Sequence, residues 1–147
     1  EQVINWSCWP PKGRRGVGFS RANLYGRYFD SYKKESQSPL IIAQIEHIKA
    51  IENLESILNV DGLDATIIGP YDLSASMGLT GELEHPDMIK VCKRVIETSK
   101  KMGVPSGLHL VSPDKKKLEY AIKDGYCFIA FSLDGVFLSE NAINPII

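Results

Sequence analysis

Leu40-Ile-Ile-Ala-Gln-Ile-Glu46 and Ala65-Thr-Ile-Ile-Gly-Pro-Tyr-Asp72 are the two stretches that decide how this chain folds. Each begins with a short apolar run, which is typical of a strand buried on both faces, and each ends in a carboxylate. A carboxylate near apolar surroundings is costly unless a partner or a cation compensates its charge. Taken singly, Glu46 and Asp72 could be ordinary strand-end residues that face water or cap helices. As a pair in this setting, they favour a site for a hard divalent cation.

Two more apolar runs, at residues 106–111 and 126–133, alternate with helical patterns, so the sequence predicts four parallel strands in an α/β fold. Such strands occur in doubly wound sheets and in eight-stranded barrels, and both folds place ligands beyond the carboxyl ends of the strands. Four strands cannot close a barrel, and the segment before residue 40 could add at most one strand, at residues 16–19. We therefore expect residues 1–147 to form a single partial domain.

Three helices are expected between and after these strands. Apolar residues spaced three and four apart predict one helix over 48–58, and His85-Pro86 begins a second helix that ends at Gly103. Ser112-Pro113 is read as the start of a third helix, which ends at Gly125. The inner faces of the second and third helices are expected to hold apolar residues: Ile89, Cys92, Val95, Ile96 and Met102 in the second, and Leu118, Ala121 and Ile122 in the third. A short tail is expected after the last strand.

The composition excludes several classes of function. The chain has 147 residues, 44% of them hydrophobic and 24% charged, with a formal net charge of -1, as in an ordinary soluble globular domain. Basic residues are dispersed, which argues against nucleic acid as a partner. No apolar stretch is long enough to cross a bilayer, and no signal peptide opens the chain, which argues against membrane insertion and secretion. Three cysteines without metal-ligand spacing predict a cytoplasmic protein. The first residues read as the last turns of a helix, so we expect a fragment.

Several polar residues should meet at the carboxyl ends of the strands: Gln44 and Glu46 from one strand, Asp72 after the next, and His109 from the third. Oxygen ligands select magnesium or manganese over zinc. A cation held by two side chains keeps positions open for water and for a chelating 2-oxo acid, and it would act as a Lewis acid toward an enolate. If Tyr71 and Asp72 begin a helical turn, their backbone N–H groups would bind the substrate carboxylate.

These residues carry a resemblance to a known family. Ala43-Gln-Ile-Glu46, Ile68-Gly-Pro-Tyr-Asp-Leu-Ser-Ala-Ser-Met-Gly78, His85-Pro86 and Pro10-Pro-Lys-Gly-Arg-Arg-Gly-Val-Gly18 together resemble the metal-dependent 2-oxo-acid aldolase and citrate lyase family. This is a branch of the phosphoenolpyruvate/pyruvate barrel enzymes that includes the 4-hydroxy-2-oxoheptanedioate and 2-dehydro-3-deoxyglucarate aldolases. The resemblance implies the C-terminal portion of a (β/α)8 TIM barrel whose N-terminal half is absent.

The same resemblance assigns roles to individual residues. It implies that Glu46 and Asp72 are the metal ligands and that Gln44, Tyr71 and Asp72 contact the pyruvyl part of the substrate. His109 lies near the position of the family's aldehyde-selecting residue. Two roles for His109, contact with the substrate and structural packing, are equally supported. The family usually has Ala where this chain has Tyr71. Its catalytic base, a His supported by an Asp, and its enolate-stabilising Arg belong to the first half of the barrel, so no catalytic residue is assigned here.

The leading hypothesis is a class II aldolase, a lyase that cleaves 4-hydroxy-2-oxo acids to pyruvate and an aldehyde with bound magnesium or manganese. Its expected partners are the small-molecule 2-oxo acid and aldehyde, together with a homo-oligomer or a complementary barrel half. One alternative is a non-catalytic truncated half-barrel or partner-binding subunit. The other is a citrate-lyase-like or malyl-thioester lyase, which would need a coenzyme A site that the sequence does not show. His47 and His85 are interpreted as helix-start residues.

Overall fold

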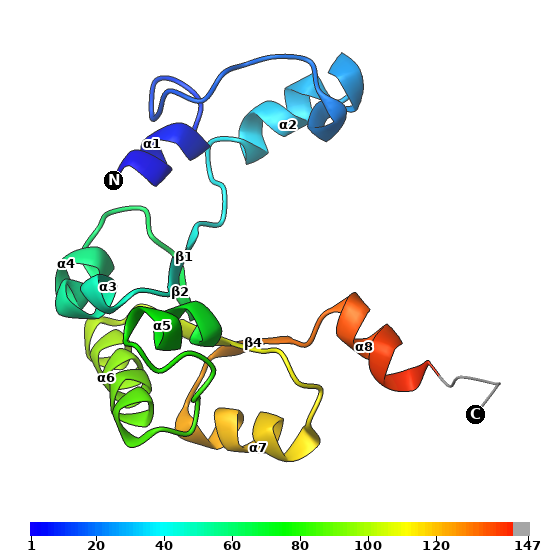
Figure 1. Cartoon of the computed structure of the whole chain (residues 1–147). Coiled ribbons are helices and arrows are strands. Elements are labelled where there is room, and N and C mark those ends of the chain that lie inside the picture. The colour runs from blue at the N-terminus through cyan, green and yellow to red at the C-terminus, as the bar shows by residue number, and fades with distance from the viewer. Residues whose placement is uncertain (143–147) are drawn as a thin grey trace. The chain divides into compact units, whose positions relative to one another are not determined.

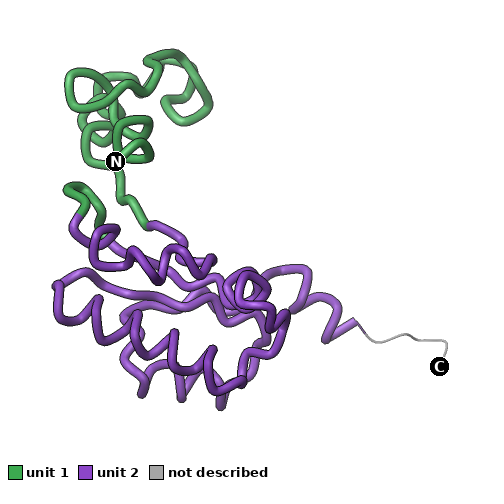
Figure 2. Tube along the Cα trace, turned by 60° about the vertical axis from the view of Figure 1, so that its left-hand side comes forward, with its two compact units in different colours: residues 1–42, 60–64 green, residues 43–59, 65–147 purple. Residues whose placement is uncertain are grey.

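The computed structural model describes residues 1–142, which divide into two compact units (Figures 1 and 2). Residues 1–42 and 60–64 form the first unit, and residues 43–59 and 65–147 form the second. The single partial domain over residues 1–147 that the sequence predicted stays a prediction. Within residues 1–142, none of the helices is long and apolar enough to span a membrane.

The first unit contains little regular structure. Helix α1 (Gln2–Ser7) and helix α2 (Phe29–Glu35) are separated by a long loop and a 3₁₀ segment, η1 (Arg21–Gly26). The strand considered at residues 16–19 does not form; these residues are irregular. The unit is held together in part by Trp9, which is buried and lies 5.6 Å from the ring centroids of both Phe29 and Tyr32.

Asn23 orders the irregular part of the first unit. Its side chain is fully buried, and its amide donates to the Gly18 carbonyl at 2.7 Å. Its Oδ1 accepts the N–H groups of Ser20 and Gly26, at 2.9 and 3.1 Å. One side chain thus satisfies three backbone groups that no helix or strand would pair.

The second unit is built around a sheet in the order β1-β2-β3-β4, with strands β1 (Ile42–Ile45), β2 (Ala65–Ile68), β3 (Ser106–Leu110) and β4 (Phe128–Phe131). Strands β2 and β3, and β3 and β4, pair in parallel. The N–H of Asp64 donates to the Ile41 carbonyl and the N–H of Gly69 to the Ile45 carbonyl, so the β1–β2 pairing advances in the same direction along both strands. The prediction of four parallel strands in an α/β fold is confirmed.

The helices of the second unit are α3 (Ile48–Glu52), α4 (Leu54–Leu58), α5 (Pro70–Ser76), α6 (Pro86–Met102), α7 (Lys115–Asp124) and α8 (Asp134–Asn141). As expected, α6 begins at His85-Pro86 and ends at Gly103, whose φ of 73° is the left-handed conformation that glycine adopts without strain. Gly125 ends α7 in the same way, with a φ of 102°.

Other details of the helices differ from the sequence-based expectation. Helix 48–58 is broken at Asn53 into α3 and α4. Helix α7 starts at Lys115 rather than after Ser112-Pro113, because the Asp114 side chain caps it by accepting the N–H groups of Lys116 and Lys117. The expected tail after β4 contains helix α8.

The predicted inner faces of α6 and α7 were also partly wrong. Ile89 is 43% exposed, whereas its neighbour Met88 is buried with Val95. Ile122 is 60% exposed, and Ala121 is the buried residue of α7. The rest of the prediction is confirmed, because Val95 and Ala121 are buried and the other predicted inner-face residues are half-buried: Cys92, Ile96, Met102 and Leu118.

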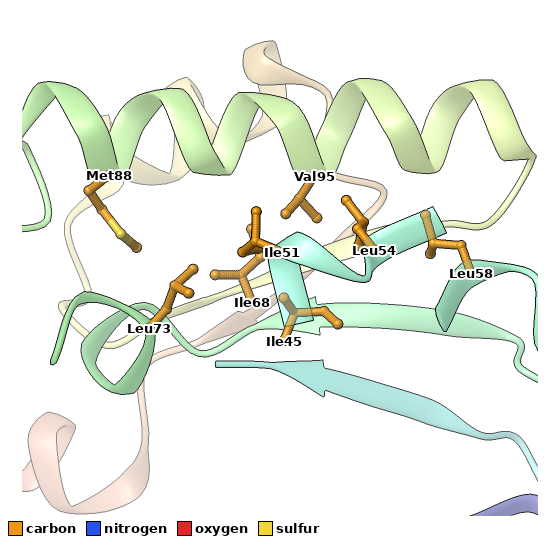
Figure 3. Close-up of a cluster of buried hydrophobic side chains, with 8 residues drawn as sticks. All are labelled: Ile45, Ile51, Leu54, Leu58, Ile68, Leu73, Met88 and Val95. Atoms are coloured by element: carbon orange, nitrogen blue, oxygen red, sulfur yellow. The ribbon is translucent and has the colours of Figure 1, made fainter. Parts of the chain in front are cut away.

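Eight fully or nearly fully buried apolar side chains form the core of the second unit. Figure 3 shows them between helix α6 and strands β1 and β2: Ile45, Ile51, Leu54, Leu58, Ile68, Leu73, Met88 and Val95. They come from β1, β2 and four helices, so this cluster fixes the strand ends relative to the helices that follow them. The packing determines where the polar residues after β1 and β2 lie.

Candidate metal and substrate site

The predicted site residues follow or occupy the carboxyl ends of three neighbouring strands. Glu46 follows β1, Asp72 follows β2 after a short turn, and His109 is the fourth residue of β3. Because the strands are parallel, these ends lie on one edge of the sheet, as the sequence predicted.

The side chains of Gln44 and Glu46 are hydrogen-bonded to each other. Alternation along β1 places both side chains on the same face, and Gln44 Nε2 donates to Glu46 Oε2 at 2.6 Å. The Gln44 side chain is exposed, and Glu46 is half-buried. Among the described residues no Lys, Arg or His pairs with the Glu46 carboxylate, which leaves its charge free for a cation.

Gly69 and helix α5 bring the second carboxylate to this edge. The N–H of Gly69 donates to the Ile45 carbonyl at 3.1 Å, and Gly69 is the residue that precedes α5. Pro70 occupies the first turn of α5 together with Tyr71 and Asp72, both of which are exposed. Tyr71 and Asp72 thus lie in the first turn of a helix, which was the condition for their backbone N–H groups to bind a carboxylate.

Tyr71 and His109 line a common cavity of about 270 Å³. Its wall is largely apolar and is supplied mainly by α6, β3 and α7, including Met88, Leu108 and Ala121. Two charged residues in the lining, Lys117 and Glu84, form an ion pair at 3.7 Å. The structure thus groups Gln44 with Glu46, and Tyr71 with His109.

Cys92 and Tyr126 also line this cavity. Burial is the main cause that raises the pKa of the Cys92 thiol, and burial likewise raises the pKa of the Tyr126 phenol well above its usual range. Both groups therefore stay protonated near neutral pH, and Cys92 is not an activated nucleophile. The sequence-based reading of Cys92 as a helix-core residue agrees with this environment.

The two histidines interpreted as helix-start residues have that role. His47 Nδ1 accepts the N–H of Lys49 at 3.1 Å and caps α3, and His85 Nδ1 accepts the N–H of Asp87 at 3.2 Å and caps α6. Both rings thereby commit one nitrogen to the backbone. Neither is free to use that nitrogen as a base or a metal ligand.

Sequence reasoning missed Ser132, which directly follows β4 at the same edge. Ser132 is buried, has a φ of 59°, and its hydroxyl has no hydrogen-bond partner within residues 1–142. A non-glycine residue with this φ is uncommon. No pattern of residue types signals it, because the strain and the missing partner are properties of the folded backbone.

The donor set at this edge fits a hard divalent cation that keeps much of its own hydration. Between Glu1 and Ala142, no group of three or more His, Cys, Asp or Glu side chains could hold a metal ion. The two predicted ligands, Glu46 and Asp72, would supply two anionic oxygens, fewer than such a group. Magnesium and manganese accept such sites because water and substrate oxygens complete their octahedral coordination.

Comparison of the sequence with known proteins identifies a family that matches nearly the whole chain. Residues 1–141 match the family model described as HpcH/HpaI aldolase/citrate lyase. The 5-keto-4-deoxy-D-glucarate aldolase of Escherichia coli O139:H28 is 33% identical over 141 residues, which are 95% of this chain and 54% of that protein. The chain thus spans about half the length of the curated relatives it matches.

Solved structures of similar fold support the same family assignment. An HpcH/HpaI aldolase from Desulfitobacterium hafniense DCB-2 superposes with a TM-score of 0.78 at 32% identity, over 94% of this chain and 54% of that one. A family protein from Burkholderia cenocepacia J2315 gives 0.84 at 29% identity, over 94% and 55%. Macrophomate synthase, at 24% identity and a TM-score of 0.71 over 94% and 50%, shares the fold. The family resemblance and the α/β fold of a partial TIM-type barrel are confirmed, and this chain belongs to the HpcH/HpaI aldolase/citrate lyase family.

Proposed function

We propose that this chain carries the metal-binding and pyruvate-binding edge of a class II aldolase that cleaves 4-hydroxy-2-oxo acids to pyruvate and an aldehyde. The observation that carries the proposal is the Gln44–Glu46 pair at the end of β1, beside the turn that leads to Asp72. Family membership and relatives named as aldolases support lyase chemistry.

In this proposal Glu46 and Asp72 hold magnesium or manganese, which supplies Lewis-acid stabilisation of enolate charge. The Gln44 amide and the backbone N–H groups of Tyr71 and Asp72, which lack partners within α5, bind the pyruvyl oxygens. His109 contacts the departing aldehyde, in the cavity that it lines together with Tyr71. Together these groups orient the substrate so that its C3–C4 bond can break.

Bond cleavage also requires a base. The proton of the 4-hydroxyl goes to the base, the electrons of the C3–C4 bond enter the enolate, and protonation at C3 then gives pyruvate. By family resemblance the base and an Arg lie in the other half of the barrel. We therefore propose that a complementary half, in the same polypeptide or in a partner, completes the site, and that the 147-residue chain alone has almost no activity.

The test is a lactate-dehydrogenase-coupled assay of pyruvate release from 4-hydroxy-2-oxo acids. It compares the 147-residue chain with the full product of the gene that encodes it, with and without chelator. We expect activity from the full product only, lost with chelator and restored by added Mn²⁺. Chelator-resistant activity of the 147-residue chain would refute both the metal and the division of labour, and absence of pyruvate from the full product would refute the reaction.

A further inference from the structure

Gly69 has no conformational reason to be glycine. Its φ of -94° and ψ of 92° lie in the extended region that any L-residue can adopt. Its N–H is bonded to the Ile45 carbonyl, so the backbone at Gly69 is tied to the strand segment between Gln44 and Glu46. The reason for glycine must therefore be the space above its α-carbon.

That space is filled by the Gln44–Glu46 pair. A Cβ at position 69 would lie 2.8 Å from Gln44 Nε2, 3.1 Å from Glu46 Oε2 and 3.2 Å from Glu46 Cβ. Contacts below 3.0 Å do not persist, so the Gln44 amide would have to move. Because that amide is the far end of a flexible side chain, it can move without unfolding the chain.

In the Gln44–Glu46 hydrogen bond, Gln44 is the donor and Glu46 is the acceptor. An ionised carboxylate only accepts hydrogen bonds, so the amide nitrogen of Gln44 must face it. One Glu46 oxygen is thus held at 2.6 Å, and the other has no protein donor within residues 1–142. Partners of this kind orient metal-ligating carboxylates, and their loss typically weakens metal affinity 10- to 100-fold.

We propose that Gln44 and Gly69 are positioning residues for Glu46. Because position 69 has no side chain, the Gln44 amide fits above its α-carbon, and we call this space the seat of the amide. The amide held there turns the Glu46 carboxylate toward a divalent cation. The assignment of a cation to Glu46 rests on the proposed function, whereas the seat of the Gln44 amide rests only on the contacts of residues 44, 46 and 69. Gln44 thereby acts on the metal through Glu46, in addition to any contact that its second N–H makes with substrate.

The experiment measures Mn²⁺ affinity of the 147-residue chain by electron paramagnetic resonance. We expect Gly69→Ala and Gln44→Ala each to weaken binding about 10- to 100-fold. Gly16→Ala is the matched control, because a Cβ there meets nothing within 4 Å and the backbone is not left-handed. Circular dichroism should show the same fold for all variants.

A double variant separates the seat from a general disturbance. If Gly69→Ala acts by displacing the Gln44 amide, it should add little in the Gln44→Ala background, so the two effects should not be additive. Full additivity, or Mn²⁺ affinity of Gly69→Ala within twofold of the wild type, would overturn the proposal.

A metal-free readout distinguishes this proposal from the proposed function. Absence of Mn²⁺ binding by the wild-type chain would refute the metal assignment of Glu46. The seat would then be judged by nuclear magnetic resonance of the Gln44 side-chain amide, identified by its loss in Gln44→Ala. We expect its signals to move in Gly69→Ala and in Glu46→Gln, but not in Gly16→Ala. Unmoved signals in Gly69→Ala would overturn the seat.

Discussion

The two compact units are built from different kinds of contact. The unit of residues 43–59 and 65–147 contains the eight-residue aliphatic cluster between helix and sheet, whereas the unit of residues 1–42 and 60–64 relies on aromatic rings around Trp9 and on backbone groups bonded to Asn23. Every residue for which we predicted metal or substrate contact lies in the unit that contains the sheet. Regular strands give repeated, parallel ends, and such ends bring separate polar residues together; an irregular loop region offers no equivalent edge.

The strongest test of this contrast removes aliphatic packing. Leu54 is fully buried in the cluster, so Leu54→Ala should destabilise the chain by about 2–5 kcal/mol through lost burial and the cavity that remains. The measurement is urea unfolding followed by far-UV circular dichroism. Leu40→Ala, at a residue that is 75% exposed, is the control and should change stability by less than about 0.5 kcal/mol. Equal effects of the two variants would show that the cluster is not the stabilising core.

The second test asks whether metal binding belongs to the sheet-containing unit. Glu46→Gln and Asp72→Asn each remove one of the two proposed anionic ligands, so Mn²⁺ affinity should fall by at least about 100-fold. Titration of Mn²⁺ measures this. The matched controls are Glu52→Gln, at an exposed residue of α3, and Asp61→Asn, at an exposed residue of the first unit; both should bind as the wild type does. Unchanged affinity in both ligand variants would rule out the assignment.

A third test compares a tightly enclosed glycine with an open one. Gly107 on β3 pairs with Phe128 on β4, and a Cβ at Gly107 would overlap the Phe128 ring. Gly107→Ala should therefore cost about 1–3 kcal/mol in unfolding free energy. Gly16→Ala in the first unit should be close to neutral, because its Cβ would enter open space. If the smaller side chain in Phe128→Leu failed to reduce the cost of Gly107→Ala, the overlap would not be its cause.

The smallest effect is expected at the cap of α7. Hydrogen bonds from the backbone N–H groups of Lys117 and Lys116 lower the pKa of Asp114. A carboxyl whose pKa is lower in the folded state stabilises the fold above its unfolded pKa, and this stabilisation disappears as pH falls through the folded pKa. Asp114→Ala should therefore unfold at lower urea than the wild type near neutral pH, and the gap should close in acid.

Two further variants complete that test. Asp114→Asn keeps an acceptor oxygen but cannot titrate, so it should retain part of the cap without the acid dependence. Glu119→Gln, at an exposed residue of the same helix, should leave the midpoint unchanged at every pH. A gap between Asp114→Ala and the wild type that persists in acid would show that the charge is not what stabilises the cap.

Sequence patterns were enough to predict the four strands, the glycines that end α6 and α7, and the shared edge of Gln44, Glu46, Asp72 and His109. They could do so because side-chain alternation follows from strand geometry, and because a helix between successive strands implies that the strands are parallel. The family resemblance supplied the expected roles of these residues, and these roles stay predictions.

The folded structure was needed to show that Ile89 and Ile122 turn outward and that a Cβ at Gly69 would meet the Gln44 amide. It was also needed to show that Tyr71 and His109 share a cavity. The order of the first unit around Trp9 and Asn23 was also beyond the sequence pattern. Each of these depends on contacts between segments that are distant in the chain. Helix phase is degenerate when apolar residues are plentiful, and space above an α-carbon exists only once a neighbouring strand is in place.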